Sequence, residues 1–138
     1  MVDAQARGVT LVVPAVEGGL TIEADPQVLA AVIANLLQNA FKFTRPLTSV
    51  TLTAGGSADR VLIQVQDQCG GLPAGDNAEE LFRPFEQRGA DRTGMGIGLA
   101  FSRWGTEANN GRLYGRNLPG EGCVFTMDLP LLAPLTTP

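Results

Sequence analysis

Apolar residues recur at helical spacing between residues 25 and 43, and this pattern predicts the first helix. Asp25 and Pro26 begin it, because an aspartate caps free backbone N–H groups and proline suits the first helical position. The apolar positions lie three and four residues apart, which defines one broad face for a core. The residues on this face are Leu29, Val32, Ile33, Leu36, Leu37, Ala40 and Phe41. We expect the helix to end near Phe43.

Other segments have the alternating or β-branched pattern of strands. Residues 49–54 and 60–67 alternate apolar with polar side chains, which predicts two half-buried strands. They read as an antiparallel hairpin whose turn, at 55–57, is longer than the tightest types. The β-branched segment 8–13 predicts a strand at the start of the chain, and 16–23 predicts a turn with a short second strand.

The segment 68–95 breaks these patterns, because it is rich in glycine and proline. Loops of this length are uncommon inside a compact domain and often act as lids. We expect one helical turn within it, at 79–82. A second helix is expected over 96–109, followed by a hairpin of strands at 112–116 and 123–129.

This order of elements predicts an α+β fold, a two-layer α/β sandwich. We expect a mixed, mostly antiparallel sheet with the helices packed on one face. A chain of 138 residues suggests a single domain over 1–138, with its core at about 8–130 and a disordered tail at 131–138. No run approaches the ~18 apolar residues of a membrane span. The start lacks a secretion-signal pattern, so we expect a soluble, cytoplasmic domain without direct membrane contact.

Composition argues against several functions, among them nucleic-acid binding and any reaction that needs a histidine of this chain. The net charge is −4 with no basic stripe, which argues against nucleic acid as a partner. Cys69 and Cys123 have the spacing of neither a zinc site nor a redox CxxC pair, so free thiols in a reducing compartment are expected. The sequence contains no histidine. Any imidazole base, ligand or phosphate acceptor must therefore come from elsewhere.

Three polar residues, Asn35, Asn39 and Lys42, form a stripe on the first predicted helix. At about 100° per residue they fall within about 60° of one another, away from the middle of the apolar face. A solvated helix surface is the simplest explanation. Such surfaces favour good helix formers, however, and asparagine is a poor one. An amide oxygen suits Mg²⁺ that already carries phosphate oxygens, and a lysine meets phosphate as a point charge.

Two glycine-rich segments complete a possible nucleotide site. Asp67 ends a strand and enters a glycine loop, where a carboxylate can accept a hydrogen bond from an exocyclic amine. Such loops are also common as ordinary turns. Gly94, Gly96 and Gly98 open the second helix, whose free N–H groups suit phosphate oxygens. The pattern is not a Walker loop, a Rossmann fingerprint or a protein-kinase signature.

With these segments in this order, the chain resembles the ATP-binding catalytic domain of bacterial sensor histidine kinases. That family stands in the GHKL group with gyrase and the ninety-kilodalton chaperones. Segment 34–44 resembles its N box, 67–73 its G1 box, 81–86 its F box, 93–100 its G2 box and 120–125 its closing G3 strand. The resemblance covers nearly the whole chain. It implies the Bergerat fold with a mobile ATP lid, and ATP and Mg²⁺ as cofactors.

The resemblance also implies roles for individual residues. Asn39 would hold Mg²⁺, with Asn35 and Lys42 near the metal and the phosphates. Asp67 would accept the adenine amine, and Arg88 would meet the terminal phosphate. The other residues that it places at the nucleotide or its lid are Gly71, Leu72, Phe82, Phe85, Gly94, Met95, Gly96, Gly98, Leu99 and Cys123.

Two cysteines depart from the family pattern. Cys69 stands where the G1 box usually has glycine, and Cys123 stands where the G3 box usually has threonine. That threonine helps to hold a water beside adenine in relatives, and a thiol is a weaker donor. We therefore expect altered adenine binding. A redox switch between the two thiols is a further hypothesis.

The resemblance favours phosphoryl transfer over ATP hydrolysis. Hydrolysing relatives carry a glutamate at the position of Asn35, and an amide cannot act as a general base. The implied acceptor is a histidine on a separate dimerisation and phosphoacceptor domain, with a response regulator further downstream. Two alternatives remain open: a non-catalytic module that senses nucleotide and docks a partner, or a serine kinase of the anti-sigma type on the same fold.

Overall fold

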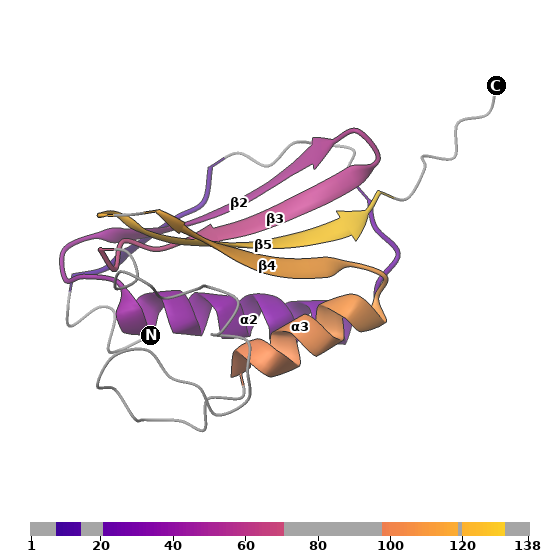
Figure 1. The fold of residues 1–138 in the computed structure, drawn as a ribbon, viewed down its shortest axis with the longest axis horizontal. Helices are drawn as coiled ribbons and strands as arrows, with labels where there is room; N and C mark the ends of the chain where they lie inside the picture. Colours follow the sequence, from indigo (N-terminus) through magenta and orange to yellow (C-terminus); the bar gives the residue numbers. More distant parts are fainter. Residues whose placement is uncertain (1–7, 15–20, 71–97, 119, 132–138) are drawn as a thin grey trace.

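The computed structural model describes residues 8–14, 21–70, 98–118 and 120–131. In this part of the chain, one sheet with the strand order β1-β2-β3-β5-β4 is covered on one face by two helices (Figure 1). The elements are β1 (Thr10–Val12), α2 (Pro26–Phe43), β2 (Ser49–Ser57), β3 (Arg60–Gln66), α3 (Gly98–Ala108), β4 (Arg112–Leu118) and β5 (Gly122–Pro130). The β1–β2 pair is parallel and the other three pairs are antiparallel. The predicted α+β sandwich with a mixed, mostly antiparallel sheet is confirmed.

Helix α2 begins and ends where the pattern predicted. The Asp25 side chain accepts hydrogen bonds from the backbone N–H groups of Gln27 (2.9 Å) and Val28 (3.3 Å). This satisfies two donors that the first helical turn cannot pair internally. The last helical residue is Phe43. The residues of α2 that are fully buried come from the predicted apolar face: Val32, Leu36, Ala40 and Phe41.

The core lies between the helices and the two adjoining strands β3 and β5. Val61, Ile63 and Val65 alternate along β3, and their partners across the ladder on β5 are Leu129, Met127 and Phe125. Side chains of paired residues point to the same face of a sheet, so these six form one apolar surface. Burying a large apolar side chain contributes about 1.5–3 kcal/mol, and this surface is therefore the main source of stability.

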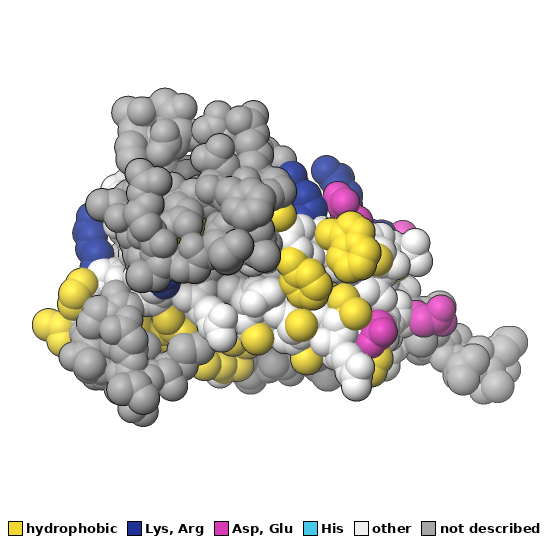
Figure 2. Space-filling view, turned by 90° about the horizontal axis from the view of Figure 1, so that it is seen from below, with side chains coloured by type: hydrophobic (Ala, Val, Ile, Leu, Met, Phe, Trp, Pro, Cys, Tyr) yellow, Lys and Arg dark blue, Asp and Glu magenta, His cyan; other side chains and the backbone are white. Residues whose placement is uncertain are grey.

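A glycine brings α3 close to α2. A Cβ on Gly105 would lie 3.0 Å from Val28 Cγ1 and 3.2 Å from Val32 Cγ2. The outward side of α3 carries Phe101 and Trp104, with 40% and 67% of their surface exposed. Their ring centroids are 6.3 Å apart in a tilted pair. Figure 2 views this helical side and shows hydrophobic side chains at its surface.

The predicted turn of the β2–β3 hairpin is wrong. Strand β2 continues to Ser57, which pairs with Arg60, so only two residues form the turn. Gly55 and Gly56 lie inside the strand, because the backbone N–H and C=O groups of glycine pair as well as those of any other residue. The positive φ that such a tight turn needs falls on Ala58 (φ 54°).

Several predicted boundaries differ or cannot be placed. The first strand is shorter than predicted, and Ile22 forms an isolated bridge with Leu131. Leu131 N also donates to Asp59 O at 2.8 Å. The segments 15–20, 71–97 and 132–138 lie outside the described residues, and with them the predicted lid, its helical turn and most of the tail. In the described part, neither helix has the length and apolar character to cross a membrane.

Candidate functional site

Asp67 follows the last residue of β3 and alters the ladder to β5. Its N–H donates to Cys123 O at 3.0 Å, as in a regular antiparallel pair. The N–H of Cys123, however, donates to the side-chain atom Asp67 Oδ1 at 3.0 Å. The N–H of Cys69 donates to the same oxygen at 3.3 Å. One carboxylate oxygen of Asp67 thus accepts hydrogen bonds from Cys123 on β5 and from Cys69 in the segment after β3.

The carboxylate of Asp67 points toward the helical layer. The alternation that sends Val61, Ile63 and Val65 toward the core sends Asp67 to the same face. Only 1% of Asp67 is exposed, and its second oxygen, Oδ2, is buried. A buried carboxylate is costly unless hydrogen bonds compensate it, and charge-assisted bonds from amides are strong ones. The two amides therefore hold a negative charge in a fixed orientation at the edge of the core.

The polar stripe of α2 is partly buried rather than fully solvated. Asn35, Asn39 and Lys42 each have intermediate exposure. Among the described residues, Asn39 Nδ2 is buried without a hydrogen-bond partner. Buried polar groups are nearly always paired, so this amide points to a ligand, an ion or a water. Lys42 Nζ lies 5.5 Å from the centroid of the Phe43 ring, a cation–π distance that holds its charge near the end of the helix.

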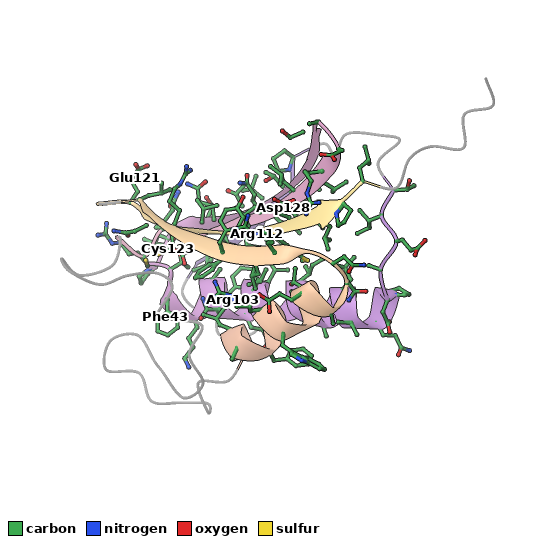
Figure 3. All side chains as sticks on the ribbon, turned by 45° about the vertical axis from the view of Figure 1, so that its right-hand side comes forward. Phe43, Arg103, Arg112, Glu121, Cys123 and Asp128 are labelled. Carbon is green, nitrogen blue, oxygen red and sulfur yellow. The ribbon has the colours of Figure 1, made fainter. Side chains whose placement is uncertain are left out.

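The residues just beyond α2 fasten its end to the segment that follows Asp67. Thr44 Oγ1 accepts a hydrogen bond from Gln68 N at 3.0 Å, and Arg45 N donates to Gln68 O at 3.1 Å. Thr44 N donates to Ala40 O at 2.9 Å and so caps the helix. Figure 3 places Phe43 and Cys123 at the same end of the molecule. This clamp sets the position of the polar stripe relative to the carboxylate of Asp67.

Sequence reasoning missed the clamp. Thr44 has 2% of its surface exposed, and it lies 24 positions from its partner Gln68. A residue whose backbone N–H caps a helix and whose hydroxyl binds a distant amide leaves no periodic signal in a sequence. Its place directly after the last apolar residue of α2 is the one local hint.

The predicted phosphate glycines are described only in part. Gly98 begins α3, and among the residues that the structure describes no atom lies within 4 Å of the place where its Cβ would be. The first turn of α3 has no acidic residue that would repel an anion. Leu99 packs against the core. The other predicted contact residues lie outside the described residues and stay predictions: Gly71, Leu72, Phe82, Phe85, Arg88, Gly94, Met95 and Gly96.

The two cysteines lie together, although their spacing in the sequence indicated no shared site. Neither forms a disulfide bond; Cys123 is buried and Cys69 is partly buried. Their sulfur atoms and a carboxylate oxygen of Asp67 all lie within 4.8 Å of one another. The pairing of Asp67 with Cys123 across the strands brings them together, and that register is not readable from spacing alone.

Comparison with known proteins identifies the family to which the chain belongs. Residues 24–133 match the family described as histidine kinase-, DNA gyrase B-, and HSP90-like ATPases, so the chain belongs to that family. Within it, the similar proteins are sensor histidine kinases. The chain is thus a member of the histidine-kinase catalytic ATPase domain family.

Individual relatives place the chain more closely. It is 37% identical over 114 residues to the sensor protein KdpD of Mycobacterium tuberculosis, covering 81% of this chain and 13% of that protein. It is 37% identical over 132 residues to the sensor histidine kinase ZraS of Salmonella typhi, covering 95% of this chain and 28% of that protein. The chain therefore spans less than a third of these relatives.

Solved structures share the fold. Full-length ShkA, crystallised with AMPPNP, superposes with a TM-score of 0.81 at 29% identity, over 95% of this chain and 27% of that one. The catalytic domain of the histidine kinase ThkA superposes with a TM-score of 0.77 at 24% identity, over 91% of this chain and 81% of that one. The second likeness supports the fold alone.

Proposed function

We propose that the chain binds Mg-ATP and donates its γ-phosphoryl group to a histidine. That histidine would lie on a separate dimerisation and phosphoacceptor domain, with a response regulator further downstream. The proposal is carried by two polar groups on neighbouring elements. Asp67 offers a buried carboxylate held by backbone amides, and Asn39 offers a buried amide nitrogen without a hydrogen-bond partner. The helix that carries Asn39 is bound at its end to Gln68, next to Asp67. Membership of the family and the AMPPNP complex of ShkA support it.

Asp67 would recognise adenine. Its Oδ1 is held by two backbone amides, so the carboxylate plane cannot rotate freely. An exocyclic amine that approaches this group meets an acceptor of fixed direction and full negative charge. A purine with a carbonyl in place of that amine, such as guanine, would bring its carbonyl oxygen against the carboxylate of Asp67, and neither group could donate a hydrogen bond. The site therefore favours adenine over guanine.

Asn39 has the chemistry to hold Mg²⁺. Rotation of its carboxamide by 180° exchanges the nitrogen and oxygen, so the buried, unmatched position can present an oxygen to a cation. Asn35 lies one turn earlier on the same stripe, and Lys42 supplies a positive charge near the helix end. A Mg²⁺ held there would offset the negative charge that develops on the phosphate oxygens.

The remaining work of the chain is positioning and charge. A neutral imidazole nitrogen of the acceptor attacks the γ-phosphorus, and the bond to the β–γ bridging oxygen breaks, so ADP leaves with that electron pair. Lys42 and the backbone N–H groups at the start of α3 would contribute positive charge and hydrogen bonds to the phosphates. Asn35 cannot deprotonate water, so hydrolysis of ATP by the isolated chain is expected to be slow.

The test replaces Asn39 by alanine and measures transfer of radiolabelled γ-phosphate to a purified histidine-bearing domain. The rate should fall by about 10²–10³, the usual loss when one electrostatic stabiliser of a transition state is removed. Gln38→Ala is the matched control, because Gln38 is the exposed neighbour on the same helix. It should transfer at the parent rate. Equal rates for Asn39→Ala and Gln38→Ala would contradict the proposal.

The phosphoprotein itself separates the alternatives. A phosphohistidine is labile in acid, whereas a phosphoserine is stable. An acid-stable product would favour a serine kinase on this fold. Nucleotide binding without transfer to any plausible histidine domain would favour a sensor that only docks a partner.

A further inference from the structure

Three side chains with metal-binding chemistry meet beside the proposed adenine contact. We propose that Asp67, Cys69 and Cys123 form a site for a soft divalent cation of the Zn²⁺ type. Their ligand atoms all lie within 4.8 Å of one another, on two buried residues and one partly buried residue. The ligands would be two thiolates and one carboxylate oxygen. This site goes beyond the proposed kinase function and does not need it.

The spacing suits tetrahedral coordination after small adjustments. Zn–S bonds of about 2.3 Å and Zn–O bonds of about 2.0–2.2 Å place ligand atoms about 3.5–3.8 Å apart. The present separations of up to 4.8 Å exceed this by about 1 Å at most, a shift that side-chain rotation can supply. Three protein ligands leave the fourth position open for water or another ligand, as in zinc sites that exchange a ligand.

The backbone orients the ligands before any ion arrives. The N–H groups of Cys69 and Cys123 both donate to Oδ1 of Asp67, at 3.3 and 3.0 Å. One side-chain oxygen of Asp67 therefore binds the backbone of both cysteines. Hydrogen bonds of this kind fix the direction of metal ligands and raise affinity. Both cysteines also pack against the hydrophobic core, which limits competition from water.

The donor set selects the kind of cation. Thiolates favour Zn²⁺ and similar soft ions over Mg²⁺ or Ca²⁺, which prefer oxygen ligands. Binding takes the protons from two thiols and releases them to solvent, and the ion brings two positive charges in their place. The formal charge of the cluster is −1 before binding, from the carboxylate, and −1 afterwards. Loading the ion therefore adds no net charge to this buried place.

One consequence rests on the proposed function. The carboxylate that would bind the ion is the one that we propose for the adenine amine. Adenine nucleotide and the soft cation should then exclude each other. The ion would inhibit the domain by occupying the base site, without touching the Mg²⁺ contact at Asn39.

The test titrates Co²⁺ or Cd²⁺ into the reduced, nucleotide-free chain, with a non-thiol reductant. We expect one ion per chain, a thiolate-to-metal charge-transfer band, and two protons released per ion in weakly buffered solution. Cys69→Ser should lower the apparent affinity by more than about tenfold and weaken the band. Cys69 is only partly buried, so this variant should keep its fold, and circular dichroism checks it. Asp128→Asn is the control, since Asp128 lies away from the cluster beside Arg60, and it should bind the ion like the parent.

Other outcomes are decisive as well. The site is overturned by the absence of a charge-transfer band, by a band that Cys69→Ser leaves unchanged, or by one ion shared between two chains. Competition with an ATP analogue is measured separately. A cysteine-dependent band that the analogue does not displace would support the metal site and contradict the adenine contact at Asp67.

Discussion

Two aspartates at opposite ends of the β3–β5 pair show how differently one carboxylate can be used. Asp128 Oδ1 accepts from Arg60 Nε at 2.6 Å, and the two side chains are 18% and 32% exposed. Asp67 is 1% exposed, and its Oδ1 accepts hydrogen bonds from the backbone amides of Cys69 and Cys123. Figure 3 labels Asp128 near Arg112, and it labels Cys123, the partner of Asp67, at the far end of the strands.

The two carboxylates differ in the free-energy cost of their burial and in the groups that bind them. A partly exposed ion pair contributes about 0–1 kcal/mol, because water and flexibility offset most of its attraction. Asp128 therefore adds little to the stability of the sheet. A buried carboxylate costs far more to keep, and amides can orient it without neutralising it. Under the proposed function, the oriented carboxylate of Asp67 would accept a hydrogen bond from the adenine amine.

The largest expected effect follows from Asp67→Asn. The new side chain has the same shape, and its oxygen can still accept from the two amides. Its NH₂ group, however, would face the adenine amine donor to donor. The affinity for an ATP analogue should fall by about 1.5–3 kcal/mol, roughly ten- to a hundredfold, as measured by calorimetry.

Asp128→Asn is the matched variant for this comparison, because it removes one negative charge from the same pair of strands. Its affinity for the analogue should equal that of the parent. The free energy of unfolding should fall by about 0–1 kcal/mol through loss of the pair with Arg60. Equal losses of affinity in both variants would show that net charge, rather than the site at Asp67, controls binding.

The next effect should follow from Gly122→Ala. A Cβ on Gly122 would lie 2.1 Å from Asp67 O and 2.8 Å from Asp67 Oδ1, so the backbone of Asp67 must move. We expect a loss of about 1–3 kcal/mol in the free energy of unfolding, together with weaker binding of the analogue. Urea unfolding and calorimetry measure the two.

Gly55→Ala controls for the loss of a strand glycine. Within the described part of the chain, a Cβ on Gly55 meets no atom within 4 Å, and alanine stabilises an unstrained strand position by up to about 1 kcal/mol. If Gly122→Ala and Gly55→Ala have the same free energy of unfolding, the backbone of Asp67 can move away from the new Cβ at little cost.

The sequence predicted best those elements whose signals are local. The cap at Asp25 and the apolar spacing of α2 lie within the helix itself, so both of its ends were predicted correctly. The predicted position of the β2–β3 turn is wrong because glycines at 55 and 56 favour a turn locally, whereas their pairing with β3 keeps both in the strand. Pairing across strands overrides local preference here.

The same distinction applies to the site. Residue type and order in the sequence predict a role for Asn39 and Asp67. In the structure, one polar side-chain atom of each, Asn39 Nδ2 and Asp67 Oδ2, is buried. The meeting of Cys69 with Cys123 depends on the register between β3 and β5, which no local pattern encodes. The clamp at Thr44 was likewise invisible, because its partner lies in another segment.

The smallest expected effect follows from Thr44→Val, and it asks whether the clamp positions Asp67. Valine keeps the shape of threonine but removes the hydroxyl, which accepts from Gln68 N at 3.0 Å and lies 2.8 Å from the hydroxyl of Thr48. Losing these two bonds should lower the free energy of unfolding by about 1–2 kcal/mol. If the clamp sets the place of Asp67 relative to α2, affinity for the analogue should also fall, by at most about fivefold. Thr44→Ser keeps the hydroxyl and should bind like the parent. Matching affinities for Thr44→Val and Thr44→Ser would show that the amides of Cys69 and Cys123 alone are enough to hold the carboxylate in place.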